Sequence, residues 1–105
     1  MALTDLDAGE REVVLECLRA ACTGPFFPDW EFQTLFGLER RDVQAVLDAW
    51  PDLDETQDGV SIATNNSMNN LLGYPHGLDK DWPRYISVPP SEVSRIFETW
   101  RGHGS

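Results

Sequence analysis

The stretch DWEFQTLFGLERRDVQAVLDAW, residues 29–50, decides the fold because it predicts two helices joined by a glycine turn. The first helix carries large apolar side chains at Trp30, Phe32, Leu35 and Phe36. It is expected to end at Gly37, since glycine adopts the left-handed conformation of a helix C-terminus at low cost. The second helix carries an apolar stripe with helical spacing at Val43, Val46, Leu47 and Trp50. Pro51 then ends this helix.

The rest of the chain predicts further helices on both sides of this hairpin. Asp7 and Glu10 form a capping-box pattern ahead of a helix over residues 8–21. A second helix covers residues 60–72, with Gly73 as its cap, and a third begins near residues 89–91. We expect an all-α fold, a compact bundle of about five helices. It forms one domain, residues 1–105, with flexible tails at about 1–4 and 102–105.

Two segments 50 positions apart share one pattern of acidic, apolar and tryptophan residues. They are DVQAVLDAW, residues 42–50, and EVSRIFETW, residues 92–100. The same register aligns apolar positions over most of the chain and predicts an internal pseudo-twofold repeat, about 1–50 and 51–101. Trp50 and Trp100 would then occupy equivalent core positions. The alternative is that short helices with similar apolar stripes align by chance.

The charge balance bears most directly on function. The chain has 18 acidic and 8 basic residues, a net charge of −10, which repels phosphate and attracts cationic surfaces. A basic protein partner therefore fits better than nucleic acid, unless the acidity serves solubility alone. The sequence shows no membrane-spanning run and no signal-peptide pattern. With Cys17 and Cys22 expected as buried thiols, a cytoplasmic location is predicted.

The helix over residues 60–72 carries four asparagines, at positions 65, 66, 69 and 70. Asparagine costs a helix about 0.6 kcal/mol relative to alanine, so this face has a purpose other than solvation. In one interpretation, Asn65 and Asn70 hold neighbouring loop backbone. In the other, part of the helix and the connector of residues 74–88 form a partner-binding surface. The expected members of that surface are Ile62, Asn66, Asn69, His76, Trp82 and Arg84.

Residues 32–47, FQTLFGLERRDVQAVL, resemble the helix-turn-helix of DNA-binding proteins. The resemblance covers about 20 residues and rests on the turn glycine and on the apolar positions Leu38, Val43 and Val46. It departs from the pattern at Gln33, where these proteins usually have a small residue. The resemblance implies an alternative function, a transcriptional regulator. Its expected DNA readers are Arg40, Arg41 and Gln44.

Catalytic and metal-binding patterns are weak. A small enzyme that uses His76, the only histidine outside the C-terminal tail, is the third hypothesis. The acidic segment Pro51–Gly59 lacks the bidentate acid of a calcium loop in both registers, and His76 with Asp79 and Asp81 lacks a fixed metal-ligand spacing. We therefore assign no catalytic residue, cofactor or metal. The expected function is a noncatalytic, acidic interaction module, inhibitor-like, immunity-like or regulatory, that binds a basic protein.

Overall fold

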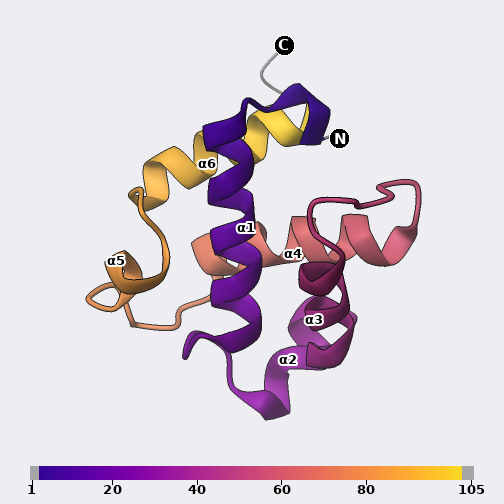
Figure 1. The fold of residues 1–105 in the computed structure, drawn as a ribbon. Coiled ribbons are helices and arrows are strands. Elements are labelled where there is room, and N and C mark those ends of the chain that lie inside the picture. The colour runs from indigo at the N-terminus through magenta and orange to yellow at the C-terminus, as the bar shows by residue number, and fades with distance from the viewer. Residues whose placement is uncertain (1–2, 103–105) are drawn as a thin grey trace.

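The computed structural model describes residues 3–102 and is built of helices (Figure 1). A short 3-10 helix precedes six α-helices: η1 (Leu3–Asp5), α1 (Ala8–Thr23), α2 (Asp29–Phe36), α3 (Arg40–Ala49), α4 (Asp58–Gly73), α5 (Trp82–Tyr85) and α6 (Pro90–Arg101). Residues 3–102 contain no β-strand, and the predicted all-α fold is confirmed. The additional α-helix is α5, a single turn inside the predicted connector.

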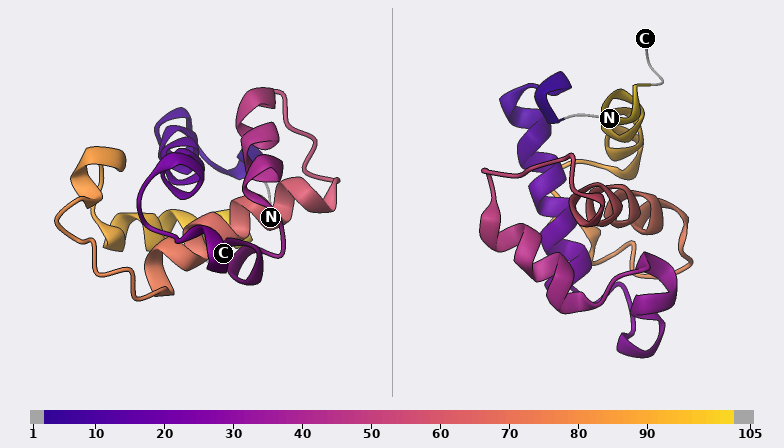
Figure 2. Two further views of the ribbon diagram at one scale, coloured as in Figure 1. Left: turned by 90° about the horizontal axis from the view of Figure 1, so that it is seen from below. Right: turned by 90° about the vertical axis from the view of Figure 1, so that its right-hand side faces the viewer.

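The two longest helices, α1 and α4, pack on each other at the centre of the fold (Figures 1 and 2). Each is covered mainly by one helix of its own half and by two shorter helices of the other half. Thus α3 packs on α1 and α6 on α4, while α2 packs on α4 and α5 on α1. All six α-helices contribute buried side chains to one continuous hydrophobic core.

Local signals account for the helix starts and for the central turn. At the start of α1, Asp7 Oδ1 accepts the Glu10 N–H at 2.7 Å, and Glu10 Oε1 accepts the Asp7 N–H at 2.9 Å. This is the predicted capping box, which satisfies two backbone donors of the first turn. Gly37 has φ 68°, the left-handed conformation predicted for the end of α2. Phe26 and Phe27, in the segment between α1 and α2, are buried in the core.

The predicted cap at Gly73 is wrong. Gly73 is the last residue of α4, and its C-cap is Tyr74 in an extended conformation, φ −74° and ψ 131°. The cause is Pro75, because a proline disfavours the helical conformation of the residue before it. The helix therefore ends at Tyr74 without a left-handed glycine.

Two tryptophans also differ from their predicted environments. Trp30 is 78% exposed, since it lies about 200° around α2 from Phe32, on the face opposite the core. Trp100 is fully buried, whereas Trp50 is only half-buried against the core. The two positions therefore differ in burial. The bulky Tyr85 of the connector is 37% exposed.

The predicted N-terminal tail is partly structured. Leu3 is buried, and its backbone N–H donates to Glu55 Oε1 at 2.7 Å. The other oxygen of this carboxylate accepts the Trp100 indole N–H at 3.1 Å, so Glu55 joins η1 to α6. Residues 3 and 4 thus belong to the fold. Residues 1–2 and 103–105 of the predicted tails lie outside the described residues.

The helices follow the 50-residue register seen in the sequence. Ala8 begins α1 and Asp58 begins α4, while Arg40 begins α3 and Pro90 begins α6. The packing of α3 on α1 corresponds in this register to the packing of α6 on α4. A repeat would produce this regularity, and the internal repeat itself stays a prediction. No helix of residues 3–102 has both the length and the apolar character needed to cross a bilayer.

Candidate functional site

Three of the four asparagines of α4 are used inside the fold. Asn66 Nδ2 donates to the Phe36 carbonyl at 2.8 Å, and Asn70 Nδ2 donates to the Leu35 carbonyl at 3.0 Å. These bonds satisfy carbonyls in the last turn of α2, which have no partner within their own helix, and hold α2 on α4. Asn65 Nδ2 donates to Asn66 Oδ1 at 3.0 Å, which orients the Asn66 amide. The amide group of Asn66 is therefore committed to the fold.

Three of the predicted partner-binding residues are accessible but separated. Ile62, which is 37% exposed, and the exposed Asn69 lie on α4. Arg84 lies on α5, has a side chain that is 77% exposed, and pairs with Asp81 at 3.8 Å. Because α5 packs mainly on α1, the structure does not bring these residues into one compact patch.

His76 and Trp82 have internal roles. His76 Nδ1 accepts the Leu78 N–H at 3.0 Å, so Nε2 carries the ring proton and donates to the Leu71 carbonyl at 3.2 Å. Trp82 is 4% exposed. The ring of His76 packs edge-on against Phe26 at a centroid distance of 4.9 Å, and the ring of Trp82 does so at 6.2 Å. Trp82 is therefore not available on the surface expected from the sequence. His76 has no ring nitrogen left to act as a base.

The predicted DNA reader Arg40 is bound within the fold. Its guanidinium donates to the carbonyls of Ala21 at 3.2 Å, Cys22 at 2.6 Å and Phe27 at 2.9 Å. It also pairs with Asp29 at 2.9 Å. These contacts join the end of α1 to the segment that leads into α2. Both terminal nitrogens of the Arg40 guanidinium are therefore engaged within the fold, and this edge is not available to read a base.

The other two predicted readers also differ from the helix-turn-helix pattern. Arg41 is 83% exposed and pairs with Glu39 at 2.6 Å, while Gln44 Nε2 donates to Asp48 at 2.9 Å. Gln44 Oε1 lies 3.5 Å from the Cys22 Sγ donor. The direct packing of α2 on α3 that this motif requires is not among the main helix contacts of residues 3–102.

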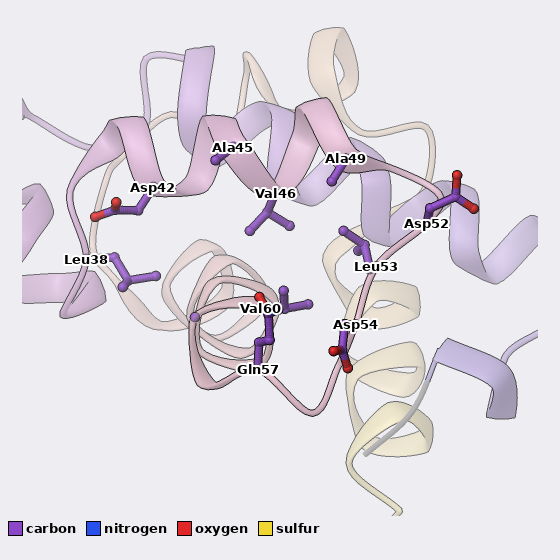
Figure 3. A pocket seen from close by; sticks show the side chains of 11 residues that line it. Leu38, Asp42, Ala45, Val46, Ala49, Asp52, Leu53, Asp54, Gln57 and Val60 are labelled. Atoms are coloured by element: carbon purple, nitrogen blue, oxygen red, sulfur yellow. The ribbon is translucent and has the colours of Figure 1, made fainter.

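A surface pocket of about 440 Å³ opens between α3, the loop that follows it and the start of α4 (Figure 3). Its floor is apolar and is formed by Leu38, Ala45, Val46, Ala49, Leu53 and Val60. Its charged border consists of Asp42, Asp52 and Asp54. We call it the α3–α4 pocket. It combines an apolar surface with carboxylates and contains no lysine or arginine in its lining.

The carboxylates stand at the two ends of the α3–α4 pocket. Figure 3 shows Asp42 near the start of α3 and Asp52 and Asp54 beyond the end of this helix, with Val46 between them. The rise of α3 from Asp42 to Ala49 is about 10 Å, so the two acidic ends are separated by at least this distance.

These carboxylates have no cationic partner within the part of the chain that the structure describes. Asp42 Oδ2 accepts the Glu39 N–H at 2.9 Å as part of the capping box of α3. Hydrogen bonds from the Thr56 hydroxyl and then from its N–H lower the pKa of Asp54. The pocket therefore presents negative charge that the fold itself does not neutralise.

The α3–α4 pocket is absent from the predictions made from the sequence, although its residues carry a local signal. The spacing of the acidic residues in Pro51–Gly59 indicates only an incomplete calcium loop. The short side chains Ala45 and Ala49 beside an acidic loop are the features that leave space for the pocket. No three metal-ligating side chains gather into a metal site within residues 3–102, so His76, Asp79 and Asp81 do not form one.

Comparison of the chain with protein-family models, curated proteins and solved structures finds no match. We therefore infer function from the geometry and charge of the chain itself.

Proposed function

We propose that the protein is a noncatalytic interaction module that binds a basic protein partner through the α3–α4 pocket. The observation that supports this best is the pairing of an apolar floor with three carboxylates that have no internal cation. Protein interfaces combine an apolar centre with a polar rim, and charge complementarity selects the partner. The rim of this pocket selects for lysine and arginine.

The charge of the whole chain supports the same proposal. The net charge of −10 attracts a basic partner over a distance of about 8–10 Å at physiological salt. The charge is dense beside the pocket, where the segment Pro51–Gly59 has four acidic residues and no basic one. Long-range attraction and the local carboxylates thus act on the same class of partner.

The histidine and the two cysteines of residues 3–102 are engaged or buried. Both ring nitrogens of His76 bond backbone groups. Burial, together with the charge of Glu16, raises the pKa of Cys17 to about 12, and burial also raises the pKa of Cys22. Neither thiol supplies a thiolate at neutral pH. The proposal accordingly assigns no catalytic residue.

A peptide-display selection on the immobilised full-length chain tests the proposal. We expect enrichment of peptides that combine lysine or arginine with apolar residues, and binding that weakens between about 50 and 300 mM salt. Selected peptides without excess positive charge would contradict the proposal. Binding of a duplex DNA probe in place of the peptides would instead favour the transcriptional regulator.

A further inference from the structure

A second surface pocket, of about 380 Å³, lies where α6 meets the start of α1. We call it the α6–α1 pocket. Its lining repeats that of the α3–α4 pocket 50 positions along the chain. Leu38, Asp42 and Val46 line the first pocket, and Val88, Glu92 and Ile96 line the second. The correspondence continues across the facing helix, where Gly59 lines the first pocket and Gly9 the second.

The two pockets differ at one position in a way that bears on ligand binding. The first has Ala45, and the second has Arg95 at the corresponding place. Arg95 Nη2 lies 2.9 Å from Glu10 Oε2, and the same guanidinium pairs with Glu92, the counterpart of Asp42. The α6–α1 pocket therefore already holds an arginine of its own chain, which pairs with two of the three carboxylates in its lining.

In the α3–α4 pocket this cation is missing. Ala45 ends at its β-carbon, and no lysine or arginine of residues 3–102 pairs with Asp42. The counterpart of Glu10 is Val60, so the floor is more apolar. The additional carboxylates stand at the far end, at Asp52 and Asp54. The α3–α4 pocket thus has Asp42, the counterpart of the acid that pairs with Arg95. It is also larger than the α6–α1 pocket, and its apolar surface can hold the aliphatic stem of an arginine.

We infer that the α3–α4 pocket receives an arginine from the basic partner, whose guanidinium pairs with Asp42 as Arg95 pairs with Glu92. The inference rests on the proposed function and names the side chain that the pocket binds. Arginine fits better than lysine because its planar guanidinium binds a carboxylate through two donors and packs on apolar surface. Its stem lies over Val46, as the aliphatic part of a long charged side chain commonly does.

The far end of the pocket defines the rest of the occupant. A second cation of the partner meets Asp52 and Asp54, which lie beyond the end of α3 and so at least about 10 Å, or about seven helical residues, from Asp42. Apolar residues between the two cations cover the floor around Leu53 and Val60. The occupant is therefore a short amphipathic segment of a basic protein, with two cations separated by at least about two helical turns.

A synthetic probe of this design makes the inference testable. The probe is a helical peptide of about 12 residues, with two arginines about seven residues apart and leucines on the same face. Its control has citrulline, which is neutral and of the same shape, in place of each arginine. Binding is measured by fluorescence anisotropy with the full-length chain. We expect the citrulline peptide to bind at least about tenfold more weakly.

Substitution of Ala45 distinguishes the pocket from the rest of the acidic surface. Ala45→Arg places a guanidinium three residues after Asp42, as Arg95 stands three residues after Glu92, and should fill the pocket from within. We expect probe affinity to fall at least about tenfold. Thr34→Arg makes the same charge change at an exposed site of α2, outside the pocket lining, and is expected to retain affinity within about threefold. Equal loss in both variants would overturn the inference.

Asp42→Asn removes the charge while keeping an oxygen that can accept the Glu39 N–H, so the cap of α3 remains. We expect this variant also to weaken the arginine probe but not the citrulline probe. A wild-type chain that binds the probe, with Asp42→Asn and Ala45→Arg binding equally well, would overturn the inference and leave the proposed function standing. Failure of the wild type to bind any basic probe would refute the proposed function itself.

Two further measurements complete the test. Arg95→Ala empties the α6–α1 pocket and is expected to add a second, weaker probe site in isothermal titration calorimetry. A stoichiometry that stays at one would contradict the correspondence of the two pockets.

Arginine amide is the small-molecule control, and binding of this compound as tightly as the peptide would overturn a protein segment as the occupant. Circular dichroism of each variant verifies that the helical fold is retained.

Discussion

Replacement of Arg40 by alanine should destabilise the protein strongly, although the alternative function, a transcriptional regulator, requires this side chain to face DNA. The guanidinium donates to three backbone carbonyls, of Ala21, Cys22 and Phe27, and lies 4.4 Å above the ring of Phe32. Two of these carbonyls belong to the last turn of α1, where a positive charge also interacts favourably with the helix dipole. One side chain thus connects α1, the loop after it and α2.

The size of the effect follows from these contacts. A hydrogen bond from a charged donor contributes about 1.5–3 kcal/mol, and we take about 1 kcal/mol for each because the side chain is 30% exposed. The contact with the Phe32 ring adds about 0.5–1 kcal/mol. The pair with Asp29 adds little, since that carboxylate is 94% exposed. We therefore expect Arg40→Ala to lower the free energy of unfolding by about 3–4 kcal/mol.

Urea unfolding followed by far-UV circular dichroism measures this loss, with Arg41→Ala as the matched control. Arg41 is 83% exposed and pairs only with Glu39, so its removal should cost less than about 0.5 kcal/mol. Arg40→Lys should recover only part of the loss, because one ammonium group does not span three carbonyls. A loss below about 1 kcal/mol for Arg40→Ala, or equal losses for both arginines, would refute the structural role.

Three further predictions concern backbone, packing and pH. Gly37→Ala should lower the free energy of unfolding by about 1–2 kcal/mol, because the backbone φ of Gly37 is 68°. Gly73→Ala should raise it by up to about 1 kcal/mol, because Gly73 is helical and has open space at its Cβ position. Urea midpoints that move in the same direction would contradict these backbone conformations. Ser67→Ala should raise the free energy of unfolding by up to about 1 kcal/mol, because the buried Ser67 hydroxyl has no hydrogen-bond partner among residues 3–102. A clearly lower midpoint temperature of thermal unfolding in this variant would show that the hydroxyl is hydrogen-bonded in the native protein. Burial, with a smaller effect of Glu16, raises the pKa of Cys17 from 9.0 to about 12, so the unfolded thiol loses its proton first and stability falls as pH rises through this window. Unfolding of Cys17→Ala beside the wild type should show a smaller loss over that range, and identical pH profiles would contradict the raised pKa.

The features of the fold that were predictable depend on residues close together in sequence. Asp7 and Glu10 are three positions apart, and their reciprocal bonds define the start of α1. Gly37 is preceded by apolar residues at helical spacing, so the turn follows from local chemistry. The error at Gly73 has a local cause too, because Pro75 ends α4 through Tyr74.

The environment of the connector was not predictable in this way. His76 and Trp82 both pack on Phe26, which lies about 50 residues earlier in the chain. A sequence shows that such rings need burial, but not which surface will bury them. The buried position of Trp82 therefore follows from the packing of α5 on α1, which is a tertiary contact.

The α3–α4 pocket illustrates the same limit for a binding site. Asp52 and Asp54 were visible as an acidic run, and Ala45 as a small residue on a helix. Their meeting around one cavity requires the loop to run beside α3, which only the folded chain shows. The comparison of Ala45 with Arg95 needed the 50-residue register as well as the second pocket.

The reciprocal packing of the two halves has a consequence for cooperativity. Because α2 lies on α4 and α5 lies on α1, each half covers the long helix of the other. Neither half can keep a closed core when its counterpart opens, so we expect a single two-state transition without a half-folded intermediate. The α3–α4 pocket takes its walls from both halves, and binding competence is therefore lost in the same step as the native fold. For this chain, a ligand of the pocket stabilises the whole molecule rather than one part of it.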